Sequence, residues 1–218
     1  MSLIEFLKSG GPVMYPLIFA SLLSLTIIIQ KLLSLREKKI INKGEIETIT
    51  TLIESGVLNK AEDICNRNTG IFNNIISAAL QNRHLKREEI KEAISDAARN
   101  EVPKVEKYLG ILGTIAGVSP LLGLLGTVTG MIKVFRIISV TGVGQAGALS
   151  GGIAEALITT ATGLTIAIPT LVMYNYFTDK AGNIIRAIEK HSLHLMNVIL
   201  EKQLEEKLMQ ANKVLETK

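Results

Sequence analysis

Three long apolar stretches limit how this chain can fold more than any other feature of its sequence. They lie at residues 9–30, 108–132 and 137–178, and the last of them carries Glu155 as its only charge. A helix needs about 20 largely apolar residues to cross the hydrocarbon core of a bilayer. The sequence therefore predicts an all-α integral membrane protein with three transmembrane helices.

Composition supports a membrane protein and argues against other classes. Hydrophobic residues make up 47% of the 218 residues, and the mean hydropathy is +0.33. The net charge is +4, but the basic residues flank apolar runs, as topology signals do. With no Trp, three His and no zinc-finger spacing, nucleic-acid binding is not expected. The single cysteine, Cys65, excludes an internal disulfide and is expected to be a reduced thiol in a cytosolic segment.

The lysines and arginines beside the apolar stretches indicate the orientation of the chain. One side collects most of them, namely Lys31, Arg36, Lys38, Lys39, Lys43, Lys91, Arg99, Lys104, Lys107, Lys180, Arg186 and Lys190. The opposite side has only Lys8, Lys133 and Arg136. We therefore expect a periplasmic amino terminus, with the large loop and the tail in the cytoplasm. No small-residue cleavage site follows the first apolar run, so that run is expected to be a retained anchor.

These patterns divide the chain into segments. In chain order, we expect a short periplasmic or interfacial segment (1–12), transmembrane helix 1 (13–33), a cytoplasmic helical domain (34–107), transmembrane helix 2 (108–133), a short periplasmic loop (134–148), transmembrane helix 3 (149–178) and a cytoplasmic C-terminal helix (179–218). The polar lead-in at 139–147 is expected to be part of that loop.

Apolar residues at helical spacing predict helices in the charged segments. The stripes are Ile46, Ile49 and Ile53, then Ile90, Ile94 and Ala97, and in the tail Ile184, Ile188, Leu195 and Val198, followed by Leu204, Leu208, Ala211 and Leu215. Breaks are expected near Gly56, Gly70 and Pro103. The tail helix is expected to pack either against the cytoplasmic loop of its own chain or against another subunit.

Glu155 is the most informative residue of the third apolar stretch. A carboxylate at membrane depth costs on the order of 3 kcal/mol, so it usually faces a cavity, a polar partner or a proton path. Thr159 and Thr162 share its helix face, whereas Thr160 lies about 140° around the helix. The orientation places Glu155 toward the outer end of the span, with the threonines one to two turns deeper. The alternative is that each hydroxyl only bonds to its own helix backbone.

The second apolar stretch carries small residues and hydroxyls. Gly113 with Gly117 and Gly126 with Gly130 form two GxxxG motifs, and Gly123 falls on an adjacent edge. Small residues at this spacing let helices approach closely in lipid, which is their default interpretation. Thr127 and Thr129 lie beside the second pair, so that a hydroxyl can face the neighbouring span. Pro120 and Pro169 are expected to kink their helices.

Several catalytic motifs are missing from the sequence. It has no GxxxxGK[ST] to hold phosphates, no HExxH to bind zinc and no GxSxG to place a nucleophile. His84, His191 and His194 are expected to be solvated surface residues rather than metal ligands. We therefore expect neither an enzyme nor a resident cofactor.

Two segments resemble a known family. "PLLGLLGTVTGMIKVF" (120–135) and "GIAEALITTATGLTIAIPTLVMYNYF" (152–177) closely resemble the second and third spans of the ExbB/TolQ/MotA proton-channel family. These motifs cover about a fifth of the chain, and the rest agrees in layout only. The ExbB branch is the most similar, TolQ follows, and MotA-type stators normally have four spans.

The resemblance implies an assembly in the bacterial inner membrane. It would be a homopentamer whose second and third helices line a central pore, with a dimer of a single-span ExbD or TolR partner inside. An aspartate of that partner would carry the proton, and the motor would energise a TonB-like protein, or a TolA-like protein in a TolQ system. The family's pore residues match Glu155, Thr160 and Thr127. Thr159 adds a hydroxyl, and either it or Thr160 would face the pore.

Other interpretations remain open at this point. Glu155 could instead form only an interhelical hydrogen bond in a non-conducting membrane scaffold. Sodium could replace the proton, because hydroxyls and a carboxylate also coordinate Na⁺. An ordinary secondary transporter is disfavoured, because such folds usually need internal repeats and more than three spans.

Overall fold

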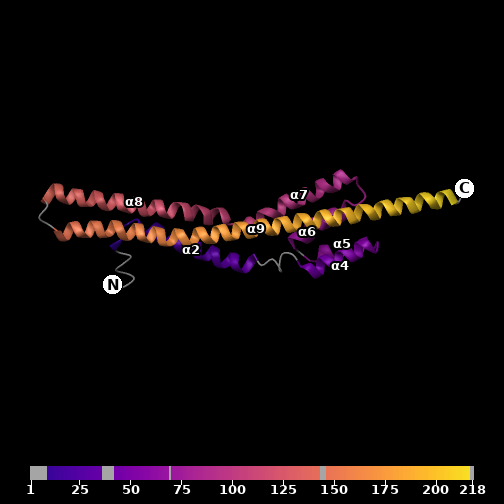
Figure 1. Cartoon of the computed structure of the whole chain (residues 1–218), viewed down its shortest axis with the longest axis horizontal. Coiled ribbons are helices and arrows are strands. Elements are labelled where there is room, and N and C mark those ends of the chain that lie inside the picture. The colour runs from indigo at the N-terminus through magenta and orange to yellow at the C-terminus, as the bar shows by residue number, and fades with distance from the viewer. Residues whose placement is uncertain (1–8, 36–41, 69, 143–145, 217–218) are drawn as a thin grey trace. The chain divides into compact units, whose positions relative to one another are not determined.

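The computed structural model describes residues 9–35, 42–68, 70–142 and 146–216. Every secondary-structure element assigned in these residues is a helix (Figure 1). This confirms the predicted all-α class. The chain divides into two compact units. We call Met1–Leu33 with Tyr108–Thr178 the membrane unit, and Ser34–Lys107 with Asp179–Lys218 the charged unit.

The membrane unit contains the three helices that are long and apolar enough to cross a bilayer. They are α2 (Met14–Ser34), α8 (Leu109–Thr141) and the first part of α9 (Ala146–Glu216). In lipid, backbone N–H and C=O groups must be satisfied within the protein, which a helix does along its whole length. The start of α2 packs on the other two helices through a cluster of apolar side chains. Its members are Val13, Met14, Leu17, Ile18, Leu122 and Ile166.

The connection between α8 and α9 is shorter than the predicted loop at 134–148. Helix α8 continues to Thr141, and α9 begins at Ala146. The segment after Lys133 is rich in apolar residues that a helix accommodates, so the charge does not end α8. The helix ends at Gly142, whose φ of +73° is one that glycine adopts at little cost. Residues 143–145 of the predicted loop lie outside the described residues.

Helix α9 is longer than either of the two helices predicted for this part of the chain, at 149–178 and 179–218. It runs through Asp179 without a break, so the expected transmembrane helix 3 and C-terminal helix belong to one helix that contributes to both units. Neither Pro120 in α8 nor Pro169 in α9 ends its helix. A kink at these prolines stays a prediction.

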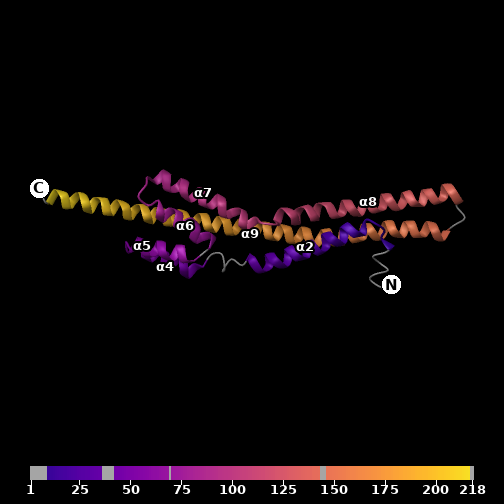
Figure 2. The same ribbon diagram turned by 180° about the vertical axis from the view of Figure 1, so that it is seen from behind.

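The charged unit is a stack of short helices beside the later part of α9 (Figure 2). They are α4 (Lys43–Glu54), α5 (Leu58–Arg67), α6 (Ile71–Gln81) and α7 (Arg87–Glu106), and each packs on the next. The core consists of large apolar side chains, among them Ile49, Ile53, Phe72, Ile75, Ile76, Leu80, Ile90, Ile184 and Leu195. Burial of such side chains away from water stabilises a water-facing unit.

Two of the three predicted breaks are confirmed. Gly56 follows α4 with a φ of +78°, and Gly70 is the residue before α6. Pro103, however, lies inside α7, so the prediction of a break there is wrong. Proline removes one backbone hydrogen bond, but α7 continues to Glu106. The chain turns instead at Tyr108, which has the left-handed φ of 69°.

The predicted apolar stripes are buried in the charged unit except for Ala97, which is half-buried, and the described side chains in the second stripe of the tail. Ile46, Ile49 and Ile53 of α4 are buried, as is the first stripe of the tail. That part of the tail therefore packs against its own chain, which was one of the two alternatives. In the second tail stripe, Leu204 and Leu208 are exposed. The side chains of Ala211 and Leu215 lie outside the described ones.

Candidate functional site

Helices α8 and α9 meet along a seam of small residues, which we call the glycine seam. A Cβ atom added to Gly130 would lie 2.8 Å from Cβ of Ala156 and 2.9 Å from the carbonyl oxygen of Gly152. At Gly123, an added Cβ would lie 3.1 Å from Cα of Thr160. These distances mean that the backbones of the two helices almost touch, as small residues allow in lipid.

The α9 side of the glycine seam is equally tight. A Cβ atom added to Gly163 would lie 2.6 Å from the carbonyl oxygen of Ser119. On α8, Gly126 faces the side chain of Thr159, whose Cβ would be 2.5 Å from an added Cβ. Gly123, predicted to lie on an adjacent edge, therefore belongs to the same packed surface as Gly126 and Gly130.

The other predicted glycine pair lies nearer the start of α8 and its two members differ. Gly113 faces the ring of Tyr174, with 3.0 Å between an added Cβ and the nearest ring atom. Around Gly117, no atom of the described residues comes within 4 Å of that position. A packing role for Gly117 stays a prediction.

Thr160 forms a hydrogen bond across the glycine seam. Its hydroxyl donates to the carbonyl oxygen of Gly123 at 2.8 Å, and the side chain is half-buried. Because Gly123 lacks a side chain, its carbonyl is within reach of the neighbouring helix. The hydroxyl oxygen keeps its lone pairs as acceptors after this bond is made.

Thr159 is fully buried and contacts a different part of the unit. Its hydroxyl lies 2.8 Å from the carbonyl oxygen of Gly10 and 2.7 Å from that of Glu155, so its proton is shared between two acceptors. Gly10 belongs to the turn that precedes α2, residues 10–13, which we call the N-terminal turn. Thr159 therefore connects α9 to the N-terminal turn.

Glu155 forms an ion pair with Lys133 that the sequence alone did not predict. Its Oε1 lies 2.5 Å from Nζ of Lys133 on α8, and the side chains of Glu155 and Lys133 are 17% and 48% exposed. On its other side the carboxylate occupies the space that a side chain at Gly11 would need. Gly11 has a φ of +69°, a conformation that also favours glycine.

The remaining predicted hydroxyls bond within their own helices. Thr127 donates to the carbonyl oxygen of Leu124 at 2.6 Å, and Thr162 donates to that of Ile158 at 2.8 Å. The predicted stripe of Glu155, Thr159 and Thr162 thus makes three different sets of contacts. Thr127 and Thr162 show the purely local bonding that was the alternative for each threonine, whereas Thr159 and Thr160 also reach outside their own helix.

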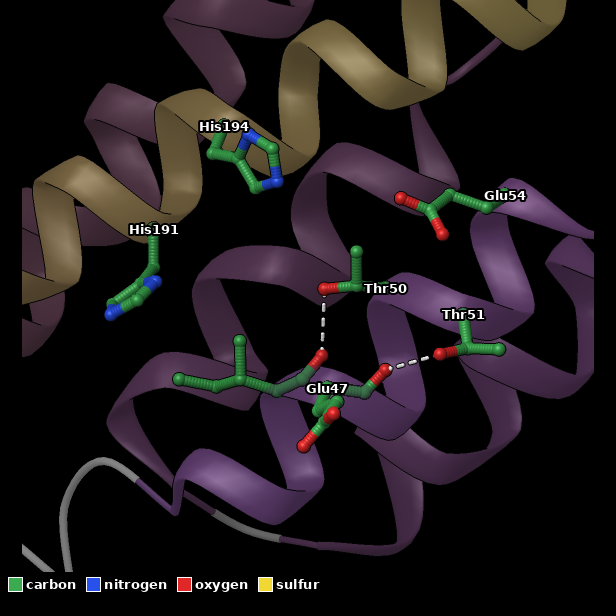
Figure 3. Close-up of a pocket in the computed structure, with 7 residues that line it drawn as sticks. Glu47, Thr50, Thr51, Glu54, His191 and His194 are labelled. Carbon is green, nitrogen blue, oxygen red and sulfur yellow. Dashed lines mark hydrogen bonds between the residues drawn. The ribbon is translucent and has the colours of Figure 1, made fainter.

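The charged unit contains a cleft that is lined largely by polar side chains (Figure 3). It has a volume of about 580 Å³ and is lined by Ile46, Glu47, Thr50, Thr51, Glu54, His191 and His194. Both threonine hydroxyls donate to carbonyls of α4, and His191 makes an edge contact with Phe72. Within the described ranges, no group of three or more potential metal ligands occurs. His194 and His84 are exposed, as predicted, whereas His191 is half-buried.

Cys65 of α5 is buried and is a poor candidate for chemistry. Burial, together with the negative charges of Glu45 and Glu62, raises the pKa of its thiol to about 11. Because the thiolate is the reactive form, this thiol is expected to be inert near neutral pH.

The fold and the membrane unit together define an integral membrane protein whose charge pair and hydroxyls lie on two closely packed spans. The sequence profile of the MotA/TolQ/ExbB proton channel family matches residues 67–190, which is more than half of the chain. The chain belongs to the MotA/TolQ/ExbB proton channel family. This is a family of membrane proton channels, not a family of enzymes.

Named relatives are biopolymer transport proteins of the ExbB type. An ExbB-like protein of Synechocystis sp. is 34% identical over 178 residues, covering 78% of this chain and 68% of the relative. The biopolymer transport protein ExbB of Pseudomonas putida is 33% identical over 174 residues, covering 76% of this chain. The match covers 52% of the Pseudomonas protein, so the chain spans about half of its length.

Proposed function

We propose that the chain is the ExbB-like subunit of an inner-membrane motor driven by the proton motive force. With an ExbD-type partner that crosses the membrane once, it would energise TonB-dependent transport across the outer membrane. Membership of a proton channel family and the likeness to proteins named ExbB support this proposal. The proposed orientation has a periplasmic amino terminus and a cytoplasmic charged unit, because Lys and Arg cluster beside the ends of the spans that join the charged unit.

The observation that carries the proposal is the set of polar groups on α8 and α9. Glu155 is the only acidic residue between Tyr108 and Thr178, and it lies toward the proposed outer end of the unit. Thr160 lies deeper and is held by Gly123, while Thr127 is one turn from Gly123 on α8. A charged group and hydroxyls on adjacent spans are the groups from which membrane proteins build ion paths.

We assign different roles to these side chains. Glu155 would control entry to the path, and the hydroxyls of Thr160 and Thr127 would offer acceptors to a proton, a water or a carboxyl of the partner. Thr159 is fully buried inside the unit, so its role would be to hold the N-terminal turn rather than to line a pore. The spans contain no aspartate, which fits a proton carrier supplied by another chain.

The assembly would be a pentamer of this chain around a dimer of the partner. Large apolar side chains on the outside of the membrane unit give such an assembly the surface it needs, for example Phe19, Leu121, Phe135 and Ile168. The coupling ion would be the proton, and a TonB-like protein would receive the work.

Replacement of Thr160 by valine tests the proposal, because valine preserves the shape of the side chain and removes its hydroxyl. Thr165→Val is the matched control, since Thr165 is exposed on the same helix and bonds only to its own backbone. In cells that express the chain with an ExbD-type partner and TonB, we expect Thr160→Val to lower TonB-dependent uptake at least about tenfold and Thr165→Val to leave it unchanged.

The same assay separates the competing interpretations. Uptake that stops with an uncoupler and ignores the removal of sodium supports the proton as the coupling ion. Full uptake by both Thr160→Val and Glu155→Ala would contradict the ion path. Rescue of envelope integrity without any rescue of uptake would indicate a TolQ-like role instead.

A further inference from the structure

We infer that Lys133 is the counter-ion of Glu155 and that the N-terminal turn closes the remaining side of their site. Lys133 would then be a positioning residue that decides when Glu155 accepts a proton. This inference rests on the proposed function, because it concerns the residue that would control entry to the ion path. It adds Lys133 and the N-terminal turn to the surroundings of Glu155.

The contact between the two side chains is direct and isolated. Nζ of Lys133 lies 2.5 Å from Oε1 of Glu155, within the range of a charge-assisted hydrogen bond. Neither side chain makes another ion pair with any described residue. Arg136, the other cation near this end of α8, is exposed. Among the described residues, Glu155 therefore has one cation to balance its charge.

The two charges lie at the same level because α8 and α9 are antiparallel. Gly130, close to Lys133 on α8, lies against Gly152 and Ala156, which flank Glu155 on α9. The backbone separation is thus fixed by the glycine seam and does not depend on the ion pair. The long lysine side chain only has to span a distance that the packed backbones already set.

The N-terminal turn confines Glu155 from another direction. The carboxylate lies where a side chain of Gly11 would be, and Thr159 binds the adjacent carbonyl of Gly10 one helical turn away from Glu155. The carboxylate of Glu155 is consequently mostly buried, with its side chain 17% exposed, whereas Lys133 keeps 48% of its side chain exposed. A buried carboxylate without its cation would be strongly disfavoured in the ionised form.

The pair gives proton entry a defined consequence. When Glu155 binds a proton, its charge is neutralised and the attraction that holds Lys133 is lost. When the proton leaves, the ion pair forms again. Proton occupancy of Glu155 is thereby coupled to the position of a cation on the neighbouring span.

Labelling with dicyclohexylcarbodiimide tests the inference without relying on transport. This apolar reagent reacts with protonated carboxyl groups in membranes, and loss of the signal in Glu155→Gln identifies the labelled residue. In membranes that contain the full chain at neutral pH, we expect Lys133→Met to increase labelling of Glu155 at least about threefold. Lys133→Arg should restore the low level, and Arg136→Met should behave as the unchanged protein.

Substitution of Gly11 tests the contribution of the N-terminal turn. Gly11→Ala should also increase labelling, because the new side chain displaces the carboxylate from Lys133. Gly56→Ala is the matched control, since Gly56 has a similar φ of +78° but open space around it. The labelling is normalised to the amount of protein in the membrane, so that a variant with reduced accumulation remains informative.

The outcomes separate this inference from the proposed function. Labelling of Lys133→Met at the unchanged level would overturn the counter-ion role, even if TonB-dependent uptake is normal. Increased labelling in a chain that supports no uptake would leave the ion pair established and refute the motor. Equal increases in Lys133→Arg and Lys133→Met would show a packing effect and also overturn the inference.

Discussion

The core of the charged unit and the contact between α8 and α9 in the membrane unit are built from different kinds of residue. In the charged unit the interior is made of large residues such as Ile75 and Leu80, which are almost completely buried. In the membrane unit the contact between α8 and α9 is made of glycines, while Phe19 and Phe135 are more than 60% exposed. The difference follows from the surroundings, because water drives apolar side chains inward and lipid does not.

The two units are therefore stabilised by different forces. The charged unit depends on the removal of apolar surface from water, which is worth about 25 cal/mol per Å². The membrane unit depends on close backbone approach and on bonds such as that from Thr160 to Gly123. The same substitution should therefore have different effects in the two units.

The largest expected effect is that of truncating a buried residue in the charged unit. Ile75→Ala should cost about 2 to 5 kcal/mol, because it removes apolar contacts and leaves a cavity. Leu121→Ala, at a site that is 63% exposed in the membrane unit, should cost less than about 0.5 kcal/mol. Calorimetry of the detergent-solubilised protein measures both. Equal losses would show that the two units do not differ in this way.

Enlargement of a residue in the glycine seam should have the next largest effect. Gly130→Leu should destabilise the protein by about 1 to 3 kcal/mol, because the added atoms meet the backbone of α9. Gly117→Leu on the same helix should be neutral, since no described atom lies within 4 Å of its Cβ position. Thermal unfolding in detergent provides the measurement. A harmless Gly130→Leu would mean that α8 and α9 do not need their close approach.

The smallest effect concerns the buried thiol of the charged unit. Because burial raises the pKa of Cys65 to about 11, maleimide labelling near pH 8 should be slow and should increase as the pH approaches 11. A Thr48→Cys, Cys65→Ser variant supplies an exposed thiol on α4 for comparison. The neutral thiol stabilises the folded state fully below pH 9.0, the ordinary pKa of a cysteine, and this contribution is lost as the pH rises toward 11. Equally fast labelling of both thiols would show that the reagent reaches Cys65 and that the core does not protect it.

Much of the fold could be predicted because hydropathy and helical periodicity are local properties of a sequence. The three spans and the buried stripe of Ile46, Ile49 and Ile53 required no knowledge of distant contacts. Helix ends were harder to predict. The sequence predicts helix ends at Lys133 and near Pro103, but both residues lie inside helices. A lysine leaves the backbone hydrogen bonds intact, and a proline removes only one of them.

The ion pair was missed for the same reason. Lys133 and Glu155 are equally far from position 144, so they face each other only if α8 and α9 are antiparallel and joined by the short connection between Thr141 and Ala146. With the predicted loop at 134–148, Lys133 is the last residue of its span and looks like a topology signal. The glycine at position 142, followed by another two residues later, was the signal that could have placed the reversal correctly.

The tightness of the glycine seam also restricts where a proton could travel. A water molecule needs a cavity of at least about 10 to 15 Å³. Between α8 and α9 even a methyl group on Gly130 or Gly163 would come within 3 Å of the opposite helix. A hydrated wire therefore has no room between these two helices. Under the proposed function, conduction would then follow a surface that the subunit turns outward, and atoms of another molecule would complete the conduit.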